Sequence, residues 1–96
     1  MSLLDTLKVS REEIIALASS YGASELRCFG SVVRRQERPD SDIDLLVRFE
    51  PGRSLMDHAG LKIALEELLG RPVDIASERG LKPRFRERIL AEAVSL

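Results

Sequence analysis

The feature that most restricts the fold of this chain is an apolar segment, residues 42–49 (DIDLLVRF), which carries two aspartates. Successive side chains of a β-strand point to opposite faces, so the aliphatic residues at odd positions would share one face and pack against a core. Asp42 and Asp44 would share the other face, about 7 Å apart at ~3.3 Å of rise per residue. Two such carboxylates repel each other unless a cation or a proton lies between them, which indicates a chemical role for this face.

A third aspartate repeats the pattern. Asp74 lies between two β-branched residues in the segment 72–76, which is typical of a short strand. If both strands turn their apolar faces to the same helices, Asp74 lies on the same face as Asp42 and Asp44. Carboxylate oxygens suit Mg²⁺ or Mn²⁺, whereas a single histidine and the lack of a cysteine near the aspartates argue against zinc. Such a cluster predicts phosphoryl or nucleotidyl transfer.

A candidate phosphate-binding turn precedes the first two aspartates. Gly30-Ser31 follows the segment 25–29, which is typical of a strand, and would open a short helix from about Val32 to Gln36. Glycine lets the backbone approach a phosphate closely, and the first amides of a helix favour an anion. The guanidinium of Arg34, one turn further on, could reach the same phosphate.

Signals for helices and strands alternate along the whole chain. Two helices are expected to begin with the spacing of a capping box, at Ser10–Glu13 and at Ser54–Asp57. They are expected to end at Tyr21-Gly22 and at Gly70. Pro83 suits the first turn of a last helix. Five residues are expected to turn the last helix inward: Phe85, Ile89, Leu90, Ala93 and Val94. The predicted order is α-β-α-β-α-β-α in one domain, residues 1–96. We therefore expect an α/β or α+β fold with a small sheet flanked by helices.

Composition excludes several classes of protein. Fifteen basic and sixteen acidic residues give a net charge of −1, which argues against direct binding of nucleic acid as the main role. Four aromatic residues, one Tyr and three Phe, are too few for a base-stacking platform. Cys28 is the single cysteine and allows no internal disulfide, and no apolar run or signal peptide indicates a membrane. These features predict a cytoplasmic protein.

The stretch from Gly30 to Val47 (GSVVRRQERPDSDIDLLV) resembles the signature of the DNA polymerase beta-like nucleotidyltransferase superfamily. The chain is similar in particular to the minimal nucleotidyltransferases, the MNT proteins of bacteria and archaea, over about residues 10–80. This resemblance implies a mixed sheet with flanking helices. It also implies transfer of a nucleoside monophosphate, AMP from ATP, with Mg²⁺ or else Mn²⁺ as cofactor.

The resemblance also assigns roles by position. It implies that Gly30 and Ser31 hold the triphosphate and that Arg34 has a looser part in nucleotide binding. It further implies that Asp42 and Asp44 bind metal, and that Asp74 binds the catalytic metal and helps to activate the attacking hydroxyl. These are the catalytic and metal-binding carboxylates that the sequence predicts.

MNT proteins are commonly paired with HEPN-domain proteins as antitoxin and toxin. The resemblance therefore implies that the chain adenylylates a tyrosine of a HEPN toxin, with homo- or hetero-oligomers as a further expectation. Two alternatives stay open: a catalytically silent antitoxin that acts by binding alone, and a nucleotidyltransferase that acts on RNA ends or on a small molecule such as an aminoglycoside.

Other notable residues have a plainer interpretation. The two aspartates at 42 and 44 could be a solvated strand edge, but Gly30-Ser31 upstream and Asp74 downstream favour the nucleotidyltransferase site. His58 is expected on a polar helix flank, and Cys28 in the core. The basic run from Arg79 to Arg88 is expected to be a solvated helix face rather than a contact for RNA or an acidic partner.

Overall fold

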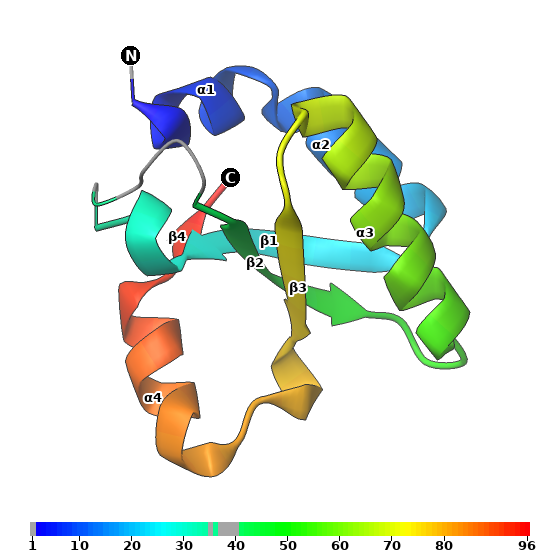
Figure 1. The fold of residues 1–96 in the computed structure, drawn as a ribbon. Coiled ribbons are helices and arrows are strands. Elements are labelled where there is room, and N and C mark those ends of the chain that lie inside the picture. Colours follow the sequence, from blue (N-terminus) through cyan, green and yellow to red (C-terminus); the bar gives the residue numbers. More distant parts are fainter. Residues whose placement is uncertain (1, 35, 37–40) are drawn as a thin grey trace.

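The computed structural model describes residues 2–34, 36 and 41–96 (Figure 1). In chain order the elements are α1 (Leu3–Val9), α2 (Arg11–Ser20), β1 (Ala23–Phe29), the 3₁₀ helix η1 (Gly30–Val32), β2 (Ile43–Phe49), α3 (Leu55–Leu69), β3 (Val73–Ser77), the 3₁₀ helix η2 (Glu78–Gly80), α4 (Pro83–Glu92) and β4 (Val94–Ser95). The fold is α+β, which confirms the predicted class. None of the helices formed by the described residues has the length and apolar character needed to cross a membrane.

The strands form one mixed sheet in the order β3-β2-β1-β4. β2 pairs antiparallel with β1 and parallel with β3, and the short β4 pairs antiparallel with β1. The long connection through α3 allows the parallel pairing of β2 and β3, because parallel strands need a crossover. This topology places β2, with its two aspartates, between β1 and β3.

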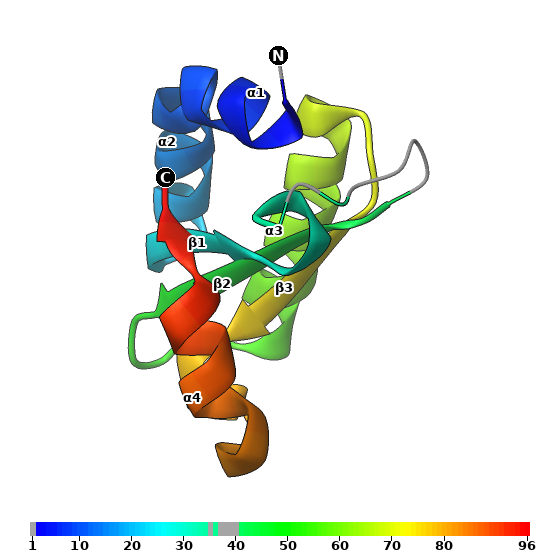
Figure 2. The ribbon, with the colours of Figure 1, turned by 90° about the vertical axis from the view of Figure 1, so that its left-hand side faces the viewer.

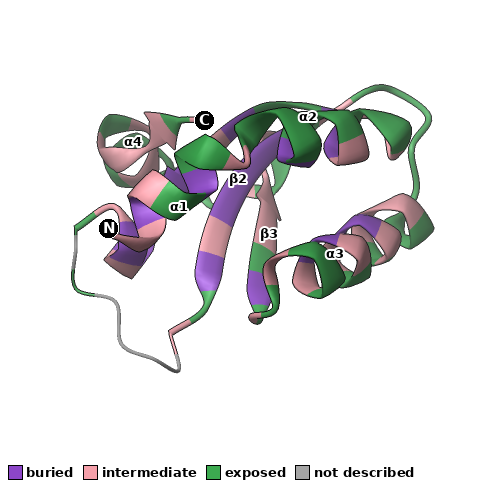
Figure 3. Cartoon of the chain, turned by 90° about the horizontal axis from the view of Figure 1, so that it is seen from above, coloured by how far each residue is buried: buried purple, intermediate pink, exposed green. Residues whose placement is uncertain are grey.

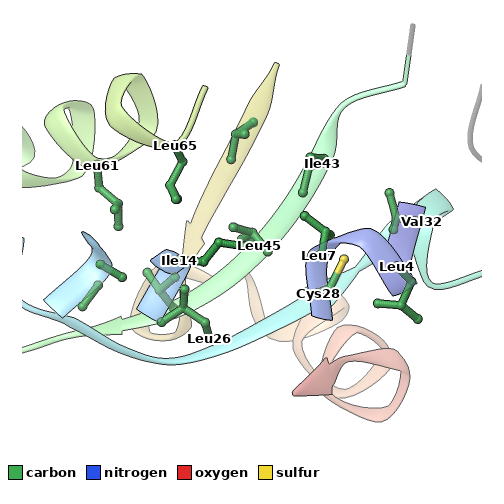
Figure 4. Close-up of a cluster of buried hydrophobic side chains, with 14 residues drawn as sticks. Leu4, Leu7, Ile14, Leu26, Cys28, Val32, Ile43, Leu45, Leu61 and Leu65 are labelled. Carbon is green, nitrogen blue, oxygen red and sulfur yellow. The ribbon is translucent and has the colours of Figure 1, made fainter. Parts of the chain in front are cut away.

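The core lies between one face of the sheet and the first three helices. Ile43, Leu45 and Val47 of β2 are 0–1% exposed, and they pack with Leu61 and Leu65 of α3 (Figure 4). This burial confirms the alternation read from the sequence. In Figures 1 and 2 the strands lie between α1 and α4, and Figure 3 shows buried residues on α1, α2 and α3 but none on α4.

Several element predictions are confirmed. Ser54 and Asp57 form the expected capping box of α3, whose C-terminus is capped by Gly70 in a left-handed conformation. Tyr21 caps the end of α2, and Pro83 occupies the first turn of α4. The strand predictions at 25–29, 42–49 and 72–76 match β1, β2 and β3 to within two residues.

Other element predictions were wrong or incomplete. The chain begins with the unpredicted α1, capped by Ser2 and Asp5, and ends with the unpredicted β4. Because α2 follows α1 directly, Ser10 closes α1 through its backbone and makes no side-chain cap for α2. The structure has the three-residue η1 at Gly30–Val32, which shares only Val32 with the helix predicted from about Val32 to Gln36. Residues 35 and 37–40 lie outside the described part of the chain.

The last helix also differs from its prediction. Phe85 is 42% exposed, and no residue of α4 is buried. Ala93 caps the helix and Val94 belongs to β4. An amphipathic pattern in the sequence thus corresponds here to a helix without a buried residue.

Candidate active site

Two of the three predicted carboxylates are direct neighbours in the sheet. Asp44 of β2 is paired with Asp74 of β3 in the parallel register, so both side chains lie on the face of the sheet that is turned away from the core. Asp42 lies two residues before Asp44, just before β2 begins. The structure thus brings the three carboxylates to one end and one face of the β2–β3 pair.

The environment of Asp44 is electrostatically unfavourable for a carboxylate. Burial raises the pKa of Asp44, and the negative charges of Asp74 and Asp42 raise it further, whereas Arg34 partly offsets them. Asp42 and Asp74 are exposed. Asp44 is therefore the member of the cluster that gains most from a nearby cation.

The Gly30-Ser31 turn lies directly against this cluster. Gly30 has φ +79, and a Cβ at this position would overlap Oδ2 of Asp44. The chain therefore requires glycine here both for its backbone conformation and for the close approach of the turn to the carboxylate. With only three residues, η1 has almost no helix dipole, so the binding of a phosphate would depend on backbone amides and on Arg34.

Arg34 and two residues that the sequence did not single out complete the surroundings. The backbone N–H of Arg34 donates to the carbonyl of Gly30 at 3.2 Å, and Nη1 lies 2.6 Å from Oε1 of Glu92. Lys62 places Nζ 3.7 Å from Oδ1 of Asp74 and donates to the carbonyl of Val73 at 2.6 Å. Glu92 and Lys62 lie far from the aspartates in sequence within ordinary charged helices, so no local pattern could have identified them.

The donor set fits a hard divalent cation. The three carboxylates supply only oxygen atoms, which Mg²⁺ and Mn²⁺ prefer. Burial is the main cause that raises the pKa of Asp44, and the negative charges of Asp74 and Asp42 add to it. Among the described residues, no three histidine, cysteine, aspartate or glutamate side chains are already gathered at metal-binding spacing.

The remaining residues noted in the sequence lie elsewhere. Cys28 is fully buried in the core, and this burial raises the pKa of its thiol to about 12. His58 is only half-exposed, because its ring stacks on Phe49 with centroids 5.5 Å apart. In the basic run, Arg86 donates to the carbonyl of Glu78 at 2.8 Å and lies 3.8 Å from its carboxylate.

Residues 11–96 match the family model of the nucleotidyltransferase domain. The chain is 40% identical over 86 residues to a Methanocaldococcus jannaschii protein provisionally named a protein adenylyltransferase, which covers 90% of this chain and 92% of the relative. It is also 40% identical over 78 residues to the protein adenylyltransferase MntA of Thermococcus cleftensis, covering 81% and 79% of the two chains.

Solved structures agree with these relatives. A structure provisionally described as a minimal nucleotidyltransferase superposes with a TM-score of 0.88 at 57% identity, covering 100% of this chain and 97% of the other. A toxin–antitoxin crystal structure with AMP-PNP superposes with a TM-score of 0.76 at 20% identity, covering 88% and 69%. At that identity the second likeness shows a shared fold.

Proposed function

The chain belongs to the nucleotidyltransferase domain family and is a nucleotidyltransferase, and we propose that it transfers AMP from ATP to a hydroxyl group of a protein partner. The observation that carries the proposal is the direct pairing of Asp44 with Asp74 beside the Gly30 turn. This pairing joins a cluster of metal-binding carboxylates to a backbone segment that a phosphate can approach closely. The protein adenylyltransferase named MntA, 40% identical to this chain, supports the choice of AMP and of a protein acceptor.

Each residue of the cluster has a distinct role in the proposed reaction. Gly30, Ser31 and Arg34 hold the triphosphate, the first two through backbone amides and the last through its guanidinium. Asp42 and Asp44, with Asp74, would hold Mg²⁺, which when bound neutralises charge on the phosphates.

Asp74 accepts the proton of the acceptor hydroxyl, because it is exposed at the edge strand β3 where an acceptor can approach. The acceptor oxygen forms a bond to the α-phosphorus, the bond to the β-phosphate oxygen breaks, and pyrophosphate leaves.

We further propose that the acceptor is a tyrosine of a HEPN toxin and that the modification neutralises the toxin. The fold shared with a toxin–antitoxin structure that contains AMP-PNP supports this role. The proposal also agrees with the exposure of Asp74 on the edge strand β3, since a protein segment needs access to this carboxylate.

The test is label transfer from α-³²P-ATP in the presence of Mg²⁺, with the purified chain and a purified HEPN-domain protein from the same genome as the acceptor. We expect a labelled partner with the native chain and loss of label by about 10³-fold or more when Asp42 and Asp44 are both changed to Asn. Glu67→Gln is the matched control, since Glu67 is an exposed carboxylate of α3 outside the cluster. Equal labelling by the double variant would contradict the mechanism.

A cell-protection assay separates catalysis from binding. If transfer to the partner neutralises it, cells that express the toxin survive with the native chain and with Glu67→Gln, but not with the Asp42, Asp44 double variant. Full protection by the double variant would indicate an antitoxin that acts by binding alone.

A further inference from the structure

Arg34 and Glu92 form a long-range ion pair beside the candidate site. Nη1 of Arg34 lies 2.6 Å from Oε1 of Glu92, and the two residues are 58 positions apart in the sequence. The Glu92 side chain is only 18% exposed. The Arg34 side chain is 44% exposed, so its guanidinium reaches solvent while the short charged hydrogen bond to the more buried Glu92 orients it.

Arg34 is also held from a second direction. Its Nε donates to Oε1 of Gln36 at 3.3 Å, within the same turn. Among the described residues, none forms a hydrogen bond or ion pair with Nη2 of Arg34. Two of the three guanidinium nitrogens thus have partners among the described residues, and these two contacts fix the orientation of the guanidinium plane.

The pair lies at the turn that the proposed function assigns to the triphosphate. The backbone N–H of Arg34 donates to the carbonyl of Gly30, so the guanidinium is anchored one turn after the Gly30-Ser31 pair. Gly30 itself lies against the carboxylate cluster, because a Cβ at this position would overlap Oδ2 of Asp44. A triphosphate bound between the turn and the cluster would therefore pass close to this guanidinium.

We infer that Glu92 is a positioning residue that orients Arg34, so that Nη2 binds the β- or γ-phosphate of the nucleotide. The inference rests on the proposed function, since it assumes that ATP occupies this turn. It adds to that function a residue of α4, which connects the C-terminal helix to nucleotide binding. Glu92 itself touches neither the nucleotide nor the acceptor.

The test measures binding of ATP and of AMP to the full chain by isothermal titration calorimetry, with Mg²⁺ and again in EDTA. We expect Glu92→Ala to weaken ATP binding about tenfold, the effect of losing one well-placed charged contact, and to leave AMP binding unchanged. Glu92→Gln keeps an acceptor for Nη1 and should lie between the native chain and Glu92→Ala. Glu87→Ala, on the same helix and exposed, is the matched control and should bind ATP like the native chain.

A double-mutant cycle with Arg34→Ala tests whether Glu92 acts through Arg34. In the Arg34→Ala background, Glu92→Ala should change ATP affinity by less than about twofold, because the residue that it orients is gone. Circular dichroism checks that each variant is folded. If Glu92→Ala does not fold, Glu92→Gln takes its place in the cycle.

The outcomes separate this inference from the proposed function. A native chain that does not bind ATP would overturn the proposed function and the inference with it. A native chain that binds ATP, together with a Glu92→Ala variant that binds ATP equally well, would overturn the inference alone. Equal losses of affinity for ATP and for AMP would mean that Glu92 only maintains the fold. Tighter ATP binding by both Glu92 variants would mean that the charge of Glu92 repels the phosphates. Either result would also overturn the inference.

Discussion

The charged carboxylate of Asp44 is unfavourable for the stability of the fold, although the proposed site requires it. Burial and two neighbouring carboxylates raise its pKa, so the folded chain binds a proton more readily than the unfolded chain does. Stability from this group is therefore fully present below the pKa of the unfolded state, near 3.8, and is lost as the pH rises through the higher pKa of the folded state.

This conflict gives a prediction for Asp44→Asn. At pH 7 the variant should be more stable than the native chain by about 1 kcal/mol, the size typical of substitutions that relieve unfavourable functional residues, while transfer activity is lost. Urea unfolding monitored by circular dichroism from pH 3 to pH 8 measures both the gain and its growth with pH. A variant less stable than the native chain at pH 7 would contradict this reading of Asp44.

Asp57 provides a comparison of opposite sign. The backbone N–H of Ser54 donates to its carboxylate and lowers the pKa of Asp57, so its contribution is present at neutral pH and is lost as the pH falls through that lowered value. Asp57→Asn should therefore destabilise the chain at pH 7, in the same unfolding series in which Asp44→Asn stabilises it.

Gly30 yields a second prediction at the scale of single residues. Gly30→Ala combines a positive φ with a clash against Asp44, whereas Gly52→Ala has φ +89 but nothing within 4 Å of the added Cβ. Gly52→Ala should cost about 1 kcal/mol from backbone strain alone. Gly30→Ala should cost roughly 2–4 kcal/mol and should also reduce transfer, because Asp44 must move. The difference is read from thermal unfolding and from the labelling assay, and equal effects of the two variants would exclude the clash.

At the scale of the elements, local chemistry determined which predictions succeeded. The capping box of α3 was predicted from Ser54 and Asp57. It is present because the backbone of Ser54 is extended, as an N-cap residue requires. The same spacing at Ser10 and Glu13 failed, since Ser10 follows α1 directly with φ −92 and ψ 10 and cannot adopt the extended conformation of an N-cap.

The two serines give a matched pair of variants. Ser54→Ala should destabilise the chain by about 1 kcal/mol, because its hydroxyl accepts from the backbone N–H of Met56 at 3.2 Å. Ser10→Ala should change stability by less than about 0.5 kcal/mol, because its side chain caps no helix. Chemical unfolding of both variants measures the difference, and a loss at Ser10 as large as at Ser54 would contradict the assignment.

At the scale of the molecule, the alternation of apolar and polar residues along β2 could be predicted from the sequence, but the pairing of the strands could not. Alternating apolar residues indicated the inner face of β2, and through it the side on which Asp42, Asp44 and Asp74 lie. Contacts between residues far apart in the chain produce no local sequence pattern from which they could be predicted. The antiparallel pairing of β1, the two-residue β4 and the ion pair of Glu92 with Arg34 depend on residues tens of positions apart.

The proposed site should also be visible in the stability of the whole chain. A ligand that binds only the folded state stabilises it by about 2.7 kcal/mol when present at 100 times its dissociation constant. For a chain of this length such a gain raises the melting temperature by roughly 10–20 °C. We expect MgATP at saturating concentration to give such a shift with the native chain and EDTA to reduce it.

The variant with Asn at positions 42 and 44 serves to localise the effect. It should melt at least as high as the native chain without ligand, since repulsion at Asp44 is relieved, yet it should respond far less to MgATP. Differential scanning fluorimetry measures all four conditions in one series. If the double variant were shifted by MgATP as strongly as the native chain, the nucleotide would be bound away from the β2–β3 carboxylates, and the assignment of this face as the active site would be wrong.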